Sequence, residues 1–321
     1  MIYVIKYNKK QKGESNMKYF KLAGNNVSRV IQGCMRIAGK TASEIDTLIG
    51  TAYDQGINFF DHADIYGRGA CEEVFGRFLA RTPGFREKIF IQTKCGIKPG
   101  VSFDFSYEHI IESVEGSLKR LGTDRIDYLL LHRPDTLVEP SEIARAFEKL
   151  KTEGKVLNFG VSNQHPLQME LLRKYLGNIP LVANQLQLSV ATCPMIDFGF
   201  NVNMTNDFSS SRENGVLEYC RLNDITIQPW SPFQYGFMEG SFIGNENFKA
   251  LNDKLDEIAA RYGVTATGMA ITWLLRHPAI MQPVIGTTTP ERVIEICKAS
   301  DVTITHDEWY ELYKSAGKRL P

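Results

Sequence analysis

A carboxylate and a phenol stand close together after a short apolar run early in the chain. Residues 57–60 are predicted to form a buried strand, with Asp61 at its C-terminal end and Tyr66 on the loop beyond it. If the chain forms a parallel barrel, that end of the strand is where the chemistry takes place. The other polar residues are therefore interpreted as groups positioned around Tyr66.

Six of the eight predicted strands end in a polar residue after an apolar run. These residues are Asp61, Lys94, His132, Ser162 with Asn163, Gln185 and Ser231. Each one alone has an ordinary structural explanation, such as a solvated strand end or a capped carbonyl. Because a barrel brings all these strand ends to one rim, the set as a whole predicts a functional site.

The elements that would position these residues follow a repeating order of short apolar strand, polar loop and amphipathic helix. The strands are predicted at residues 30–33, 57–60, 89–94, 126–131, 156–161, 181–189, 225–230 and 282–286. Ahead of them, residues 19–22 and 27–32 flank Gly24-Asn25-Asn26, which predicts a hairpin.

Several helices are predicted from their end signals. Ser43 with Asp46 indicates the start of the first helix, and residues 72–80 form the second. Ser106 and Gly122 bound the third. Later helices are predicted to begin at Pro140, Pro166 and Pro290, the second of them ending at Leu176.

Eight strands alternating with helices predict an α/β fold, a (β/α)8 TIM barrel with an N-terminal β-hairpin. A doubly wound sheet is the alternative, but no G-x-G-x-x-G follows an early strand, since Glu72 occupies the third glycine's place after Gly67-Arg68-Gly69. The sequence contains no P-loop lysine motif and no H-E-x-x-H, so no metal site is predicted.

The composition excludes several classes of partner. The 321 residues include 37 Lys plus Arg and 37 Asp plus Glu, so neither nucleic acid nor an anionic membrane is expected as the main partner. No apolar stretch is long enough to span a membrane. Six scattered cysteines without a C-x-x-C pair predict reduced thiols and a cytoplasmic location.

The first sixteen residues are basic and polar and lack the apolar core of a secretory signal. We expect residues 1–16 to be a disordered extension because little in them can be buried. Residues 17–321 are expected to form a single barrel domain.

Several motifs together resemble the aldo-keto reductase family. They are FDHADIYG at residues 60–67, Thr93-Lys94, LKRLGTDRIDYLLLHR at residues 118–133, GVSN at residues 160–163 and PVIG at residues 283–286. The resemblance covers residues 17–317 in one register. Within the family, the chain is most similar to the bacterial oxidoreductases of the YdhF type.

The resemblance implies a catalytic tetrad of Asp61, Tyr66, Lys94 and His132. A phenol with a pKa near ~10 is a poor acid at neutral pH, and the Lys94 ammonium would lower that pKa. Asp61 would hold Lys94 charged and in place, while His132 would orient a carbonyl oxygen. Tyr66 would act as general acid in reduction and general base in oxidation.

The resemblance also implies NADPH (NADP+) as cofactor and a small aldehyde or ketone as substrate. The predicted cofactor residues are Met35, Arg36, Ser162, Asn163, Gln185, Trp230, Ser231, Gly286, Thr287, Thr288, Arg292 and Glu295. Of these, Trp230 would stack on the nicotinamide, and Arg292 would contact the 2′-phosphate. The chain departs from the family at Gly286, where many eukaryotic members carry a second cation, and at Ile296, where they often carry Asn.

An alternative function is a nicotinamide-binding regulatory subunit with little or no turnover, since the family contains such members. The intact tetrad gives no reason to expect lost activity. Substrate specificity is expected to reside in residues 190–214, 233–247 and 305–321. A monomer or a weak homo-oligomer is expected.

Overall fold

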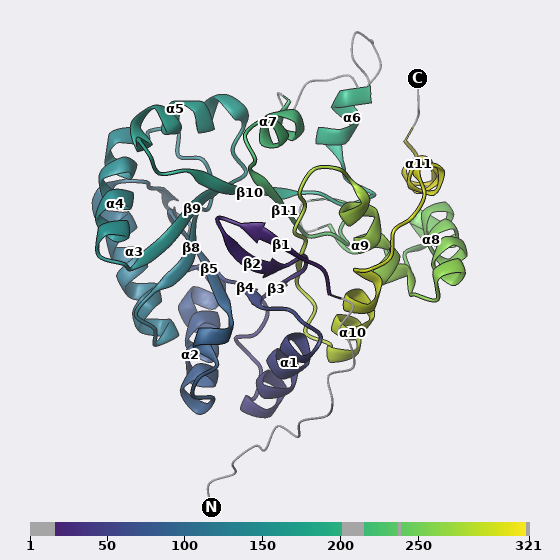
Figure 1. Ribbon diagram of the computed structural model, residues 1–321, viewed down its shortest axis with the longest axis horizontal. Helices are drawn as coiled ribbons and strands as arrows, with labels where there is room; N and C mark the ends of the chain where they lie inside the picture. The colour runs from purple at the N-terminus through teal and green to yellow at the C-terminus, as the bar shows by residue number, and fades with distance from the viewer. Residues whose placement is uncertain (1–16, 201–214, 237–238, 319–321) are drawn as a thin grey trace, which may run out of the picture.

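Eight parallel strands follow one another in chain order around a barrel (Figure 1). The structure is a computed structural model that describes residues 17–200, 215–236 and 239–318. The strands are β3 (Ile31–Gly33), β4 (Phe59–Asp61), β5 (Phe90–Cys95), β8 (Ile126–Leu131), β9 (Val156–Ser162), β10 (Leu181–Gln187), β11 (Thr226–Trp230) and β12 (Val284–Ile285). A parallel bridge between Ile227 and Met281 joins β11 to the segment before β12. The predicted (β/α)8 barrel is confirmed, whereas the predicted extension at residues 1–16 lies outside the described residues.

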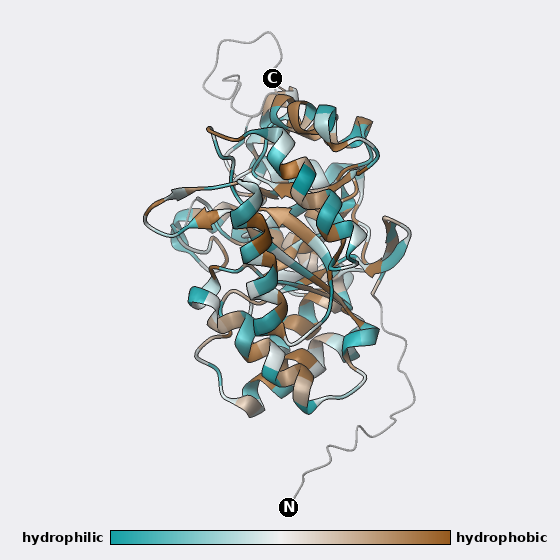
Figure 2. Ribbon diagram, turned by 90° about the vertical axis from the view of Figure 1, so that its left-hand side faces the viewer, coloured by the Kyte–Doolittle hydropathy of each residue, from teal (hydrophilic) through white to brown (hydrophobic). Residues whose placement is uncertain are grey.

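Helices surround the strands and turn their hydrophilic faces outward (Figure 2). They are α1 (Ala42–Asp54), α2 (Ala70–Arg81), α3 (Tyr107–Leu121), α4 (Pro140–Thr152), α5 (Pro166–Leu176), α6 (Pro194–Phe200), α7 (Val216–Leu222), α8 (Lys249–Tyr262), α9 (Ala266–Arg276), α10 (Pro290–Ala299) and α11 (His306–Ser315). The sequence patterns do not predict α6 to α9 or α11. Along the described residues, none of the helices has the length and apolar character needed to cross a membrane.

The N-terminal hairpin forms, but its turn differs from the prediction. Strands β1 (Tyr19–Leu22) and β2 (Asn25–Ser28) are joined by Ala23 and Gly24, whose φ angles are 47° and 83°. A two-residue turn with positive φ at both positions matches the twist of paired strands, so Asn25 pairs with Leu22 instead of lying in the turn. Residues 27–32 consequently divide between β2 and β3.

The predicted cap of the first helix is also wrong. Thr41 caps α1, because its hydroxyl accepts from the Glu44 amide at 3.3 Å while the Glu44 carboxylate accepts from the Thr41 amide at 2.8 Å. Ser43 already lies inside the first turn, and Asp46 pairs with Arg81. The predicted bounds of β8 and α5 are confirmed, as are the Ser106 cap and the Gly122 end of α3.

The hairpin closes the end of the barrel where the strands begin (Figure 1). The Tyr128 hydroxyl inside the barrel donates to the Leu22 carbonyl at 3.1 Å and accepts from the Asn25 amide at 2.9 Å. Leu22 and Val27 of the hairpin pack against Phe59 and Tyr128. The opposite end, where the predicted site residues lie, is left open.

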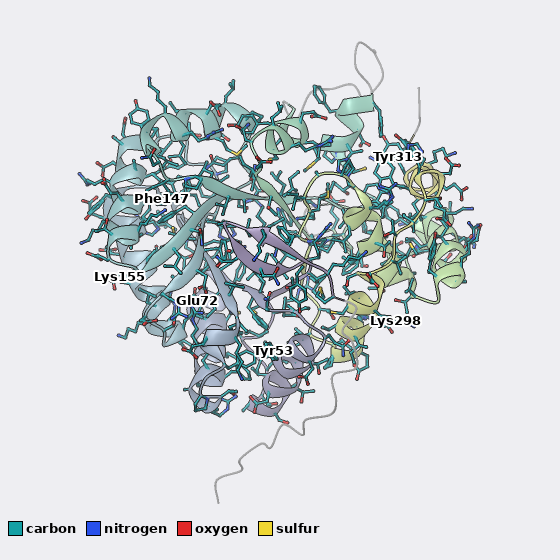
Figure 3. All side chains as sticks on the ribbon, in the orientation of Figure 1. Tyr53, Glu72, Phe147, Lys155, Lys298 and Tyr313 are labelled. Atoms are coloured by element: carbon teal, nitrogen blue, oxygen red, sulfur yellow. The ribbon has the colours of Figure 1, made fainter. Side chains whose placement is uncertain are left out.

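Two contacts between layers hold the helices on the barrel. Phe147 of α4 stacks on Phe159 of β9 with ring centroids 4.1 Å apart (Figure 3 labels Phe147). The buried carboxylate of Glu72 on α2 accepts from Thr93 of β5 at 2.6 Å and from Arg120 of α3 at 2.8 Å. Because Thr93 adjoins Lys94, the second contact fixes both helices to the strand that carries the predicted catalytic lysine.

Candidate active site

A cavity of about 690 Å³ opens at the C-terminal ends of the strands. Thirteen of the predicted site residues line it, namely Met35, Arg36, Asp61, Tyr66, His132, Ser162, Asn163, Gln185, Trp230, Ser231, Gly286, Thr287 and Arg292. The barrel therefore brings together side chains that are distant along the chain.

Lys94 lies fully buried beneath the cavity and contacts two other members of the predicted tetrad. Its Nζ lies 2.8 and 2.7 Å from the two Asp61 carboxylate oxygens and 3.2 Å from the Tyr66 hydroxyl. It also donates to the His62 carbonyl at 2.7 Å. Burial lowers the pKa of Lys94, but Asp61 and Tyr66 outweigh burial and raise it, so the ammonium is retained.

The pKa of Tyr66 differs from the sequence expectation. Burial raises the pKa of the phenol above its usual 10.0, while the Lys94 ammonium opposes that rise. Lys94 thus acts in the predicted direction, but its effect is smaller than that of burial. The Tyr66 hydroxyl is consequently protonated at neutral pH and is a proton donor in that range.

His132 lies beside Tyr66, with ring centroids 5.9 Å apart and planes at 82°. Its amide donates to the Cys95 carbonyl at 2.9 Å, which ties the residue to β5. Burial, followed by the charges of Lys94 and Arg133, lowers the pKa of His132 well below 6.5. A neutral imidazole carries one N–H, so His132 is a single hydrogen-bond donor at neutral pH.

The predicted nicotinamide-binding residues form a connected group at the ends of β9, β10 and β11. The Asn163 side chain donates to the Ser162 hydroxyl at 2.7 Å and accepts from the Trp230 indole at 3.2 Å. Ser162 in turn donates to the Gln185 carbonyl at 2.9 Å. Asn163 holds a φ of 56°, a sparsely populated conformation for a residue with a side chain.

The other end of the cavity adjoins the start of α10. Gly286, Thr287 and Arg292 line this end, and a Cβ at Gly286 would meet only open space. Thr288 and Glu295 are not among the lining residues, and the Glu295 carboxylate instead accepts from the Thr265 hydroxyl at 3.4 Å. Ile296, at the position where relatives often carry Asn, lines the cavity, as does Thr267, which the sequence does not predict.

The charges of the cavity wall fit an anionic dinucleotide. Three arginines line it, Arg36, Arg133 and Arg292, whereas Asp61 is the one carboxylate among the lining residues and is paired with Lys94. A helix N-terminus beside Arg292 adds free amide donors that suit a phosphate.

The expected specificity segments contribute unequally to the cavity. From residues 233–247 it is lined by Phe233, Gln234, Ser241 and Ile243. Ile97 of the small hairpin β6 (Ile97–Lys98) and β7 (Ser102–Phe103) also lines it, and the sequence analysis does not predict this hairpin. The described parts of residues 190–214 and 305–321 contribute no lining residue.

All six cysteines are free and buried. Burial raises the pKa of the Cys34 and Cys95 thiols well above 9.0, so neither forms a reactive thiolate at neutral pH. The free thiols agree with the predicted reduced cysteines.

Known proteins are similar to this chain in sequence and in fold. The chain matches the Aldo/keto reductase family over residues 29–316. It is 36% identical to a 6-dehydroglucose reductase of Agrobacterium fabrum, over 92% of this chain and 96% of that one. It is 32% identical to the oxidoreductase YdhF of Escherichia coli, over 91% of this chain and 95% of that one.

A solved structure is also similar. The thermostable aldo-keto reductase Tm1743 superposes with a TM-score of 0.74 at 25% identity, covering 93% of this chain and all of that one. Together with the family match over most of the sequence, these findings show that the chain belongs to the aldo-keto reductase family.

Proposed function

We propose that this protein reduces small aldehydes or ketones to alcohols with NADPH, using Tyr66 as the proton donor. The observation that carries the proposal is the position of Lys94 Nζ, which contacts both the Asp61 carboxylate and the Tyr66 hydroxyl. The His132 ring lies beside the Tyr66 ring, and both residues line the cavity.

Carbonyl reduction requires a hydride on the carbon and a proton on the oxygen. NADPH supplies the hydride when it is bound. The Tyr66 O–H gives its proton to the oxygen, and the phenolate left behind is stabilised by the Lys94 ammonium. Neutral His132 donates a hydrogen bond that orients the carbonyl and stabilises charge on its oxygen.

The cofactor would be held at two places. Ser162, Asn163 and Gln185 carry amide and hydroxyl groups suited to a carboxamide, and Trp230 offers a ring face beside them. At the other end, Arg292 offers a guanidinium fork suited to the 2′-phosphate, which is the reason for preferring NADPH to NADH. The proposal places the substrate against Ile97, Phe233 and Ile243.

The test mixes the purified protein with NADPH and a panel of aromatic aldehydes and dicarbonyls, and follows NADPH absorbance. The panel includes 6-dehydroglucose, which appears in the name of the Agrobacterium fabrum relative. We expect turnover of at least one compound, and Tyr66→Phe should lower kcat between about a hundredfold and about ten thousandfold. Tyr128→Phe, at the closed end of the barrel, is the matched control and should keep most of the activity.

Cofactor binding, measured by fluorescence titration, separates the possible outcomes. Tyr66→Phe should bind NADPH as the unmodified protein does. Tight binding of NADPH without turnover across the panel would count against the proposal and favour the regulatory-subunit alternative.

A further inference from the structure

The interior of the barrel beneath Tyr66 and Lys94 is polar, whereas branched aliphatic residues usually fill this place. Four buried glutamines lie there, Gln92, Gln185, Gln228 and Gln282. Gln92 and Lys94 are two residues apart on β5, so both side chains point into the barrel. We call these four glutamines the amide layer.

Gln92 connects the amide layer directly to Asp61. Its side-chain nitrogen donates to Asp61 Oδ1 at 2.6 Å and to Gln228 Oε1 at 2.8 Å. Its oxygen accepts from Gln228 Nε2 at 3.0 Å. Asp61 Oδ1 also accepts from Gln185 at a longer distance of 3.2 Å, so Gln92 is the closer of its two amide donors.

The orientation of Gln92 is fixed from both ends of this chain of hydrogen bonds. Gln228 donates its second hydrogen to Gln282 at 3.1 Å, and Gln282 donates to the Ser28 carbonyl at 2.9 Å. A backbone carbonyl and a carboxylate both only accept hydrogen bonds. Each amide therefore has one assignment that satisfies its neighbours, and it is the one that presents an N–H to Asp61.

We propose that Gln92 is a positioning residue, which holds the Asp61 carboxylate in the plane where it keeps the Lys94 ammonium at the Tyr66 oxygen. This inference rests on the proposed role of Tyr66 and Lys94. Without Gln92 the carboxylate keeps one longer amide contact and can rotate. The ammonium then follows it away from the phenol, and the phenolate loses its stabilising charge.

Titration of the Tyr66 phenol tests the inference without any turnover. Phenolate absorbance is recorded against pH for the full chain and for Gln92→Met, each as a difference from the same protein carrying Tyr66→Phe. Loss of the aligned ammonium should raise the midpoint of the Tyr66 titration by about one pH unit or more. The ionisable groups that face Tyr66 are Asp61, Lys94, Cys71, His132 and Arg133, and none of them is altered in Gln92→Met.

Gln282→Met is the matched control, because it removes a buried amide of the same layer that does not touch Asp61. In this variant the Asp61 carboxylate, which only accepts hydrogen bonds, still fixes the orientation of the Gln92 amide. It should lower the melting temperature about as much as Gln92→Met while leaving the Tyr66 midpoint in place. Equal midpoints in Gln92→Met and the unmodified protein would overturn the inference and leave Gln92 a core residue. Gln92→Asn, whose shorter side chain withdraws the amide from Asp61, replaces Gln92→Met if that variant does not fold, with the same expected shift.

Kinetics give a second readout that is tied to the proposed function. Gln92→Met should lower kcat for carbonyl reduction between about tenfold and about a hundredfold with little change in the substrate KM. If the unmodified protein shows no turnover, the proposed function fails while the titration still decides the role of Gln92.

Discussion

Burial has more influence than neighbouring charge on the protonation of Tyr66 and His132. It keeps the Tyr66 phenol protonated against the pull of Lys94, and it keeps His132 neutral. Both residues are consequently hydrogen-bond donors at neutral pH, which suits reduction. Oxidation of an alcohol needs the phenolate and should become faster as the pH rises.

Asp64, on the loop between Asp61 and Tyr66, gives a pH-dependent contribution to stability. Burial, followed by the charge of Glu72, raises its pKa from 3.8 to about 7. Between these values the folded chain binds a proton that the unfolded chain does not, so this group makes the free energy of unfolding fall as the pH rises from 4 to 7.

Asp64→Asn is therefore expected to stabilise the protein at pH values above this window. Relative to the unmodified chain, its free energy of unfolding should increase between about pH 4 and about pH 8 by more than about 1 kcal/mol. Urea denaturation at several pH values measures this difference. Asp54→Asn, at the exposed end of α1, is the control, and a constant difference between Asp64→Asn and the unmodified chain would contradict the assignment.

The sequence predicts the residues of the proposed tetrad but not the groups that surround them. Asp61, Tyr66, Lys94 and His132 follow from motif positions at strand ends. The upward shift of the Tyr66 pKa does not follow from the motif, because the motif shows the neighbouring charge and not the depth of burial. Gln92, Gln228 and Gln282 belong to no motif, so their place beneath Asp61 appears only when the strands are in register.

Helices α2 and α3 approach each other closely behind β5. A Cβ at Gly76 of α2 would overlap the carbonyl oxygen of Arg120 and lie 2.9 Å from the backbone of Leu121. These are backbone atoms near the end of α3, so relief would require moving the helix that carries Arg120 to its contact with Glu72.

Gly76→Ala is accordingly expected to lower the free energy of unfolding by about 1–3 kcal/mol through overpacking. The measurement is denaturant unfolding, with unchanged slope. Gly39→Ala is the control because a Cβ there meets nothing within 4 Å, and it should change stability little. If Gly76→Ala were as stable as Gly39→Ala, α2 and α3 could move apart without a loss of stability, and the prediction would be wrong.

Long elements with clear end signals are predictable, and very short ones are not. Helix α5 begins at a proline, and β8 is apolar except for Asp127, so both match their predicted bounds. Strands β6 and β7 have two residues each, too few for any period. At α1 both Ser43 and Thr41 begin a capping pattern, and only the backbone decides in favour of Thr41.

At the scale of the molecule, the cavity joins residues that the chain keeps far apart. Tyr66 follows the second strand of the barrel, whereas Arg292 lies on the helix after the last strand. The single cavity between them supports one long ligand with a reactive end and a phosphate end.

Arg292→Met should therefore weaken the binding of NADPH and leave the binding of NADH nearly unchanged. Loss of a charge-assisted contact is expected to raise the KM for NADPH between about tenfold and about a hundredfold while the NADH value stays within about twofold. Initial rates with both cofactors measure this ratio. Arg77→Met, an exposed arginine on α2, is the control, and an unchanged ratio in Arg292→Met would remove this residue from cofactor recognition.

The alternation of strands and helices, together with the absence of G-x-G-x-x-G after an early strand, predicts the barrel. It does not predict which loops reach the cavity. Residues 233–247 and residues 305–321 are both expected to set specificity. Residues of the first segment line the cavity, whereas α11, in the second, packs beside α8 and does not line it. The difference depends on packing between distant helices.

The hairpin that seals one end of the barrel leaves the site reachable from the other end alone. Asp61 and Lys94 of the proposed tetrad lie on barrel strands. Ile97 of the β6–β7 hairpin and Phe233, Gln234, Ser241 and Ile243 instead line the cavity from connecting segments. Descendants of one ancestral gene can thus inherit the same reaction and acquire new substrates by exchanging two surface segments.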